Sequence, residues 1–198
     1  MKKFSRADLG FVILLLFFAL IAFSPKVKGL VLRQLIRTGL YEPKIDHLKP
    51  REVTPADRPA PKPAPSVKFR TSGGETIDLA DARGKVIFLN FWATWCPPCL
   101  AEMPSVNALR SRFKDNPSVV FIMADADNNL KRSEQFMKKH DYDLPVYEPA
   151  GTIPRSIFES TLPTTVIVNK QGEIVFFHEG MADYNSEEMA RFINELAK

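Results

Sequence analysis

Apolar positions divide the chain into two parts with different patterns. Near the N-terminus they form one uninterrupted run, whereas from Val67 onward they fall into short runs separated by polar turns. The run VIFLNFW at positions 86–92 is nearly continuous, which is typical of a strand buried on both faces of a sheet. A second run of this kind covers Val119–Ala124. These two runs predict the central strands of a buried sheet.

The segments around these strands complete a pattern of alternating helices and strands. We expect helices from Cys99 to about Phe113, from Leu130 to His140, and from an Asn185 cap to the C-terminus, with Glu188 completing a capping box. Shorter elements are expected at Val67–Thr71, Thr76–Asp78, Leu144–Tyr147, Pro154–Phe158 (a helical turn), Thr164–Val168 and Ile174–Phe177. Strands that alternate with helices and end in a hairpin predict an α/β fold with a central mixed sheet flanked by helices.

The N-terminal apolar run indicates a membrane segment. Its 15 residues, Leu9–Phe23, fall between a signal-peptide core and the about 20 residues of a full membrane helix. A signal peptide cleaved after Ser24 is the alternative, because Ala22 and Ser24 have the required spacing, but Pro25 disfavours cleavage there. We therefore expect residues 1–26 to form an uncleaved signal-anchor, a single transmembrane helix whose flanking lysine extends the short span.

Two further segments separate the predicted anchor from the predicted domain. Residues 27–41 place apolar and basic positions near helical spacing, so they form either an amphipathic helix in the membrane interface or a continuation of the anchor. Residues 42–66 hold seven of the sixteen prolines, which favours extended polyproline conformation over helix or sheet. We expect a semi-rigid linker there, with a ligand for a proline-binding domain as the alternative. The folded domain is then expected at 67–198.

Charge is unevenly distributed, which changes the meaning of the net charge of +4. Residues 1–65 carry 12 Lys and Arg against 5 Asp and Glu, whereas residues 66–198 carry 15 against 18. The basic excess beside the anchor suits a surface of acidic lipid, and we expect no nucleic-acid partner. Basic residues on the two sides of the apolar run nearly balance, so charge alone does not fix the topology.

The chain has only two cysteines, Cys96 and Cys99, at the point where a buried strand gives way to a helix. Disulfide exchange needs one thiolate that attacks and a second thiol that releases the mixed disulfide. We expect Cys96 to be exposed at the sheet edge, where the helix dipole favours its anion, and Cys99 to be shielded one turn inside. A metal site is not expected, since no second cysteine pair exists and the three histidines are scattered. We also expect no cofactor besides the redox-active pair itself.

The two residues between the cysteines refine this chemistry. Neither Pro97 nor Pro98 has an N–H group, so two donors that could stabilise the Cys96 thiolate are missing. Our hypothesis is that the pKa of Cys96 is lowered only modestly, which favours a reductant over a strong oxidant. A thiol titration that gave a pKa near 4 would contradict it.

The residues around the cysteine pair resemble a known family. The stretch NFWATWCPPCLAEMP at 90–104 is similar to the active-site segment of the TlpA/ResA-like, membrane-anchored branch of the thioredoxin superfamily. The resemblance covers roughly residues 67–198 and implies a thioredoxin-like fold. It also implies a cis peptide bond before Pro163, opposite the cysteines. The substrate groove it implies consists of Trp95, for which core packing is the alternative, Pro97, Pro98, Leu162, Pro163 and Thr164.

The chain departs from thioredoxin at one position of the strand before the motif. Thioredoxin has a buried aspartate there that is thought to assist deprotonation of the resolving cysteine, whereas this chain has Asn90. Solvent, the substrate or Glu102 would have to take that role. Of these we do not favour Glu102, because a glutamate near the start of a helix more often interacts with the helix N-terminus.

The resemblance implies a function as well. It implies a protein disulfide oxidoreductase in which Cys96 attacks and Cys99 resolves. The implied direction is mainly the reduction of exported proteins, with cytochrome c maturation as one such role. The implied partners are disulfide-containing envelope proteins and a membrane thiol electron donor. The implied location is the cytoplasmic (inner) membrane, crossed once, with the catalytic domain facing the periplasm or an equivalent extracytoplasmic side.

Two other classes on a similar fold are the alternatives. A thiol peroxidase-like antioxidant enzyme would need a Thr-x-x-Cys motif, but Thr94 precedes Cys96 by two residues rather than three. A non-enzymatic copper-carrying module would need Cys-x-x-x-Cys and a histidine before the last hairpin, and the sequence has neither. Both alternatives therefore rank below the oxidoreductase.

Overall fold

The computed structural model describes residues 62–198 without a break and eight residues before them. Those eight, all helical, are Gly10, Val12, Leu14, Val27, Gly29, Val31, Gln34 and Leu35. Most of the predicted anchor at 1–26 and of the predicted linker at 42–66 lies outside the described residues. Among the residues that are described, no helix combines the length and the apolar character needed to cross a bilayer.

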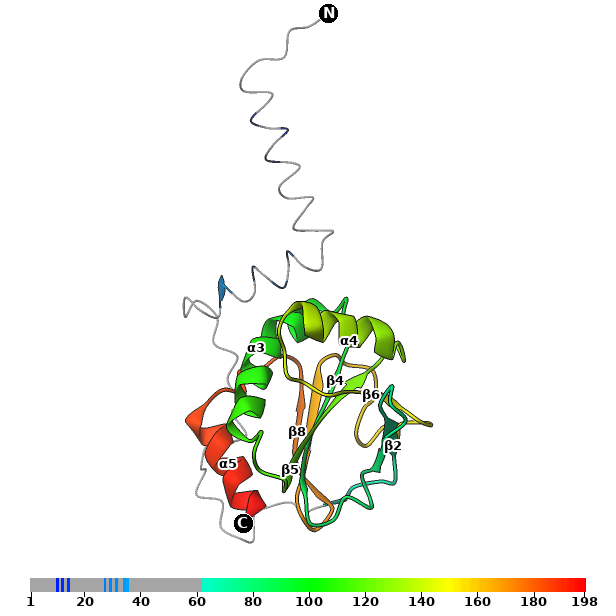
Figure 1. Ribbon diagram of the computed structural model, residues 1–198. Helices are drawn as coiled ribbons and strands as arrows, with labels where there is room; N and C mark the ends of the chain where they lie inside the picture. The colour runs from blue at the N-terminus through cyan, green and yellow to red at the C-terminus, as the bar shows by residue number, and fades with distance from the viewer. Residues whose placement is uncertain are drawn as a thin grey trace, which may run out of the picture.

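The described domain is one mixed sheet flanked by helices (Figure 1). In chain order its elements are β1 (Lys62–Pro63), β2 (Lys68–Arg70), β3 (Thr76–Asp78), β4 (Val86–Trp92), α3 (Pro97–Arg112), β5 (Val119–Asp125), α4 (Leu130–Lys139), β6 (Val146–Pro149), β7 (Thr164–Val168), β8 (Glu173–Glu179) and α5 (Glu187–Ala197). The strand order is β1-β8-β7-β4-β5-β6-β2-β3. Because β4 pairs in parallel with β5 and antiparallel with β7, the sheet is mixed, as the sequence predicts.

Strand β4 lies in the middle of the sheet and is buried on both faces, which confirms the prediction made from its continuous apolar run. Its even-numbered apolar residues belong to a core cluster that contains residues of α3, α4 and α5. Its odd-numbered residues belong to a second cluster with residues of the β2–β3 hairpin and of the segment around Ile157. Since side chains alternate along a strand, Asn90 points to the same face as the helices.

Helix α3 begins two residues earlier than predicted, at Pro97 rather than Cys99, with Cys96 as its N-cap. The first helical positions need no N–H partner, so the missing donors of Pro97 and Pro98 cost nothing there. The motif between the cysteines is therefore the first turn of the helix. This start fixes Cys96 at the junction between β4 and α3.

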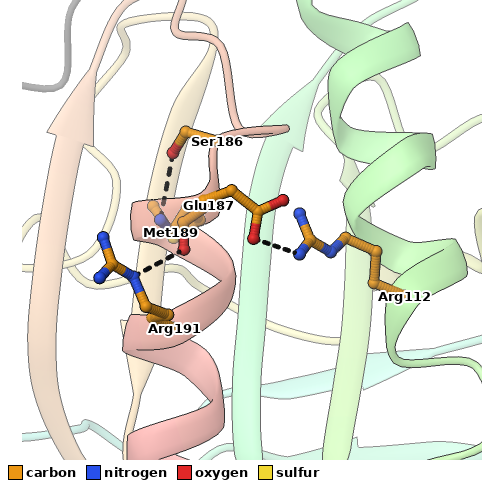
Figure 2. Close-up of polar contacts among 5 residues, drawn as sticks. All are labelled: Arg112, Ser186, Glu187, Met189 and Arg191. Atoms are coloured by element: carbon orange, nitrogen blue, oxygen red, sulfur yellow. Dashed lines mark hydrogen bonds and ion pairs between the residues drawn. The ribbon is translucent and has the colours of Figure 1, made fainter.

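The N-cap of helix α5 is also one residue away from the predicted position. Ser186, not Asn185, caps the helix, and its hydroxyl accepts a hydrogen bond from the Met189 N–H at 3.1 Å (Figure 2). The Asn185 N–H donates instead to Asp183 Oδ1 at 2.9 Å, in a turn that precedes the helix. That turn leaves Ser186 with the extended backbone that an N-cap requires.

An exposed ion pair joins the end of α3 to the start of α5. Arg112 Nη2 lies 2.8 Å from Glu187 Oε2, as Figure 2 shows. The arginine lowers the pKa of the Glu187 carboxyl and the glutamate raises the pKa of Arg112. Each charge also suits its helix end, since an acidic group favours an N-terminus and a basic group a C-terminus.

The sheet begins inside the segment predicted to be a linker, so that boundary is wrong. Strand β1 pairs Lys62 with Ile174 and Pro63 with Glu173, and the Ala64 N–H donates to the Gly172 carbonyl at 2.8 Å. Proline is tolerated here because β1 is an edge strand, where one side of the backbone needs no partner. The domain therefore starts at Lys62 or earlier, and the prediction of a start at Val67, which was based on proline content, was too late.

Candidate active site

The cysteine pair lies where β4 ends and α3 begins. A tight turn follows the strand, with the Cys96 N–H donating to the Ala93 carbonyl at 3.2 Å. Cys96 and Cys99 are joined by a disulfide, and their Cα atoms are 5.3 Å apart. The Cys99 N–H points at Cys96 Sγ at 3.3 Å, as an N-cap partner does. One backbone donor thus faces this sulfur even though the two prolines supply none.

Both cysteines are buried in this disulfide state. Cys99 is 0% exposed, as expected, but Cys96 is only 3% exposed, so the expectation of an exposed Cys96 is wrong. The reason is that both sulfurs belong to the core cluster on the helix-covered face of the sheet, which also contains Ala93 and Met103. In this state Cys96 therefore presents little surface to a substrate.

The Leu162–Pro163 peptide is cis, as the resemblance implies. Strand β7 runs antiparallel to β4 and pairs Thr164 with Phe91, which brings Pro163 to the end of β4 that leads into the cysteines. Leu162 is partly buried and packs against the cluster that contains both cysteines. The Pro163 carbonyl accepts the Gly180 N–H at 2.8 Å, so this segment is fixed from the neighbouring strand.

Trp95 is 49% exposed, which excludes its alternative assignment as a core residue. Its Nε1 donates to Asp127 Oδ2 at 2.7 Å. Asp127 belongs to a loop that is itself ordered by buried Asp125, whose carboxylate accepts the N–H groups of Asp127 and Asn129 at 3.1 and 2.6 Å. The indole beside Cys96 is therefore held in place by the loop between β5 and α4.

A buried carboxyl group lies one helical turn beyond the cysteines. Glu102 is 2% exposed and follows Cys99 by three residues, so the two side chains lie on the same face of α3. Its Oε1 accepts Asn90 Nδ2 at 2.8 Å, and its Oε2 accepts the Ala182 N–H at 3.1 Å. Burial raises the pKa of Glu102 to about 8, although both hydrogen bonds oppose the rise. The group can therefore exchange a proton near neutral pH.

The contacts of Glu102 continue into a buried hydrogen-bonded chain across the sheet. Asn90 Nδ2 also donates to Thr165 Oγ1 at 2.9 Å, and the Tyr184 hydroxyl is 2.7 Å from the same oxygen. Burial, and to a lesser extent the Glu102 charge, raises the pKa of Tyr184 well above its usual value. Tyr184 therefore remains a neutral donor.

The structure corrects the interpretation of Glu102 as a residue of the helix N-terminus. The first turn of α3 contains no acidic residue, and the side chain points into the core. One feature of the sequence could have predicted this contact, since Asn90 and Glu102 are both polar residues at positions that face the core. The Ala182 contact, 80 residues away along the chain, carried no such signal.

Gly29 of the N-terminal part lies against the active-site helix. A Cβ atom at this position would be 3.2 Å from Leu100 Cβ and 3.5 Å from the Pro97 carbonyl oxygen. The first of these separations is tighter than nine in ten real Cβ contacts, so the absence of a side chain eases this approach.

Comparison with known proteins agrees with the fold and the cysteine geometry. Residues 59–191 match the Redoxin family. This chain belongs to the Redoxin family. The match includes the cysteine pair, the cis-proline segment and Glu102, and it begins before Val67, in line with strand β1.

This redoxin is similar to two named bacterial proteins and to a protein of solved structure. It is 32% identical over 136 residues to thiol-disulfide oxidoreductase ResA of Bacillus thuringiensis subsp. konkukian, covering 68% of this chain and 77% of that protein. It is 35% identical over 118 residues to thioredoxin-like protein YneN of Bacillus subtilis, covering 59% and 69%. The crystal structure of StoA from Bacillus subtilis matches with a TM-score of 0.52 at 25% identity, covering 68% of this chain and 98% of that one.

Proposed function

We propose that this redoxin is a protein thiol–disulfide oxidoreductase that reduces disulfides in exported proteins, with the cysteines of apocytochrome c as one substrate class. The observation that carries the proposal is the close Cys96–Cys99 pair at a strand-to-helix junction, with the buried Glu102 carboxyl on the same helix face. The similarity to a relative named as a thiol-disulfide oxidoreductase supports it.

The reaction consists of two exchanges that move two electrons from the protein to its substrate. The Cys96 thiolate attacks one sulfur of the substrate disulfide, which breaks that bond, forms a mixed disulfide and releases a substrate thiolate that takes up a proton. The Cys99 thiol then loses its proton and attacks Cys96 Sγ. This step breaks the mixed disulfide, releases the second substrate thiol and leaves the Cys96–Cys99 disulfide.

Glu102 is the group that accepts the Cys99 proton in this scheme. A free cysteine has a pKa of about 8.5, so a carboxylate whose pKa is about 8 can take its proton at little cost. The helix spacing places the two side chains on one face, and both are shielded from bulk water. Within this chain, the acid on α3 thus replaces the aspartate that thioredoxin carries on the strand.

The reducing direction is supported by the sequence between the cysteines. Because Pro97 and Pro98 lack N–H groups, the Cys99 N–H is the backbone donor that faces Cys96 Sγ. A weakly stabilised thiolate makes the dithiol form less favourable, and a less favourable dithiol is a better reductant.

The proposal also includes a place in the cell and an electron donor. The apolar run at the N-terminus and the basic residues beside it support an anchor in the cytoplasmic membrane, with the domain on the extracytoplasmic side. The disulfide that forms must be reduced again, and a membrane protein with a reactive dithiol is the donor class that such an anchor favours.

Two cysteine variants test the proposed order of attack. Cys99→Ser removes the resolving thiol, so the mixed disulfide with a disulfide-bonded Cys-x-x-Cys-His peptide should accumulate and be visible by mass spectrometry. Cys96→Ser is the matched control and should trap no peptide. Equal trapping by both variants, or none by either, would show that Cys96 is not the attacking group.

A further inference from the structure

The buried hydrogen-bonded chain behind the cysteines contains one polar atom without a partner. Asn90 is 0% exposed, and its Oδ1 has no hydrogen-bond partner, whereas its Nδ2 donates both to Glu102 and to Thr165. A buried amide oxygen without a partner is costly, because nothing replaces the hydrogen bonds that it makes to water in the unfolded chain. This unpaired oxygen belongs to the residue that hydrogen-bonds to Glu102, whose pKa is raised by burial. The two observations together point to a role for Asn90 other than packing.

Either the nitrogen or the oxygen of the Asn90 amide could form hydrogen bonds at the position that Nδ2 now occupies. It lies 2.8 Å from Glu102 Oε1 and 2.9 Å from Thr165 Oγ1, and each of these oxygens can accept or donate, depending on where its proton is. The amide nitrogen and oxygen are nearly equal in size, so rotation of the amide by half a turn exchanges them without new space.

We propose that Asn90 is a positioning residue that holds Glu102 in one place in both of its protonation states by presenting either end of its side-chain amide. The inference rests on the proposed function, in which Glu102 takes the proton of Cys99. When Glu102 is a carboxylate, Nδ2 donates to it, as in the present arrangement. When Glu102 is protonated, Oδ1 takes the place of Nδ2 and accepts the Glu102 O–H.

The neighbouring groups on the Glu102 side of the amide fit the protonated arrangement. The Thr165 hydroxyl donates to the same Oδ1, while the Tyr184 hydroxyl continues to donate to Thr165 Oγ1. The Ala182 N–H donates to Glu102 Oε2 in both states. Each hydroxyl then has an acceptor, while the amide N–H groups take the place of Oδ1, which has no partner in the present arrangement.

The titratable groups near this carboxyl include Tyr184, which remains neutral, and the two cysteines on its own helix. An aspartate at position 90 could not replace the amide, because as a carboxylate it could only accept and would repel the Glu102 charge. An apolar residue could neither donate nor accept. The amide therefore fits a carboxyl group that changes protonation during each reaction cycle.

The test is a titration of the oxidised full-length chain in detergent micelles by NMR, with Glu labelled at the side-chain carboxyl carbon and Asn labelled with 15N. The Asn90 side-chain amide signals should shift with the same midpoint as the Glu102 carboxyl. In Asn90→Leu, the loss of one donor to the carboxylate should move that midpoint to a pH about one unit higher. Thr165→Val is the control and should move it far less, because it keeps the Asn90–Glu102 contact.

The outcomes separate this inference from the proposed function. Asn90 amide signals that stay constant through the Glu102 titration would overturn it even if Asn90→Leu failed to fold, because that measurement uses the native side chain. An unchanged Glu102 midpoint in a folded Asn90→Leu chain would overturn it too. If the dithiol form reduced no protein disulfide, the proposed function would be contradicted. The titrations of Glu102 and Asn90 could still be measured and interpreted, because they do not depend on that reaction.

Discussion

At the scale of single residues, the proposed proton acceptor is the Glu102 carboxyl, which hydrogen-bonds to Asn90 and the Ala182 N–H on the same helix face as Cys99. Its burial sets its chemistry, because a desolvated carboxyl takes up a proton far more readily than one in water. Two consequences of the raised pKa can be measured separately, one in the reaction and one in stability.

Replacing Glu102 by Gln should slow the resolving step. The carboxylate form is the base, so in the wild type the rate at which Cys99 releases a trapped mixed disulfide should rise as the pH increases through about 8. In Glu102→Gln the Cys99 thiol must lose its proton to solvent, so the rise should move to higher pH and the rate near pH 8 should fall by about a hundredfold. Stopped-flow measurement of release from a preformed mixed disulfide reports this step directly. An unchanged pH profile would assign the proton to solvent or substrate.

The same substitution should change how stability depends on pH. Between about pH 4.5 and about pH 8 the unfolded chain ionises this group and the folded chain does not, so unfolding releases a proton. The stabilising contribution is complete below about pH 4.5 and is lost as the pH rises to about 8, by up to about 1.4 kcal/mol per pH unit. Urea unfolding of the oxidised protein should show this slope in the wild type and in exposed Glu195→Gln, but not in Glu102→Gln.

The hydrogen bond between Trp95 and Asp127 should matter for protein substrates. Asp127→Ala frees an indole that is 49% exposed beside Cys96, so a substrate must order it on binding. We expect KM for a protein disulfide to rise about two- to tenfold with kcat little changed, as the net value of one hydrogen bond implies. Asp115→Ala, in an exposed turn away from the site, is the control. Equal KM values in the two variants would show that Trp95 is not part of the substrate groove.

The sequence predicted the reactive pair but not its surroundings, for a physical reason. Cys96 and Cys99 are recognisable because their spacing is local and their chemistry is unusual. The burial of Glu102 depends on Asn90, twelve residues before it, and on Ala182, eighty residues after it. No local pattern encodes contacts of that range.

At the scale of elements, strands were easier to predict than their ends. The continuous apolar run at Val86–Trp92 predicted β4 with the observed boundaries, because burial on both faces leaves little choice of residue. The start of α5 was one residue wrong because Asn185 and Ser186 are both good N-caps, and the choice depends on a turn made by Asp183. Strand β1 was missed because proline-rich composition hides a two-residue edge strand.

The corrected cap can be tested with a matched pair of variants. Ser186→Ala removes the oxygen that accepts the Met189 N–H and should lower the free energy of unfolding by about 1 kcal/mol. Asn185→Ala leaves that hydrogen bond in place and should cost a few tenths of a kcal/mol at most. Urea unfolding of both variants measures the difference, and the reverse order would restore Asn185 as the cap.

At the scale of the whole molecule, two features relate the N-terminal part to the domain: their opposite net charges and the contact of Gly29 with the active-site helix. The N-terminal part is basic and the domain mildly acidic, which suits a domain tethered to an acidic lipid surface. Gly29 lies against Leu100, directly after the cysteine pair in sequence. A residue of the N-terminal part therefore lies next to the active-site helix.

The most direct test of the reducing function is the redox state of the pair in growing cells. Free thiols are trapped with an alkylating reagent that adds mass, and the fraction of Cys96 and Cys99 that is alkylated is read from the shift in mass. A reductase that receives electrons should carry a largely reduced pair in an otherwise oxidising compartment, and its dithiol form should become oxidised when a disulfide-bonded substrate is added. A pair that is fully oxidised in cells with an intact electron supply would contradict the proposed direction and assign the protein to disulfide formation or isomerisation instead.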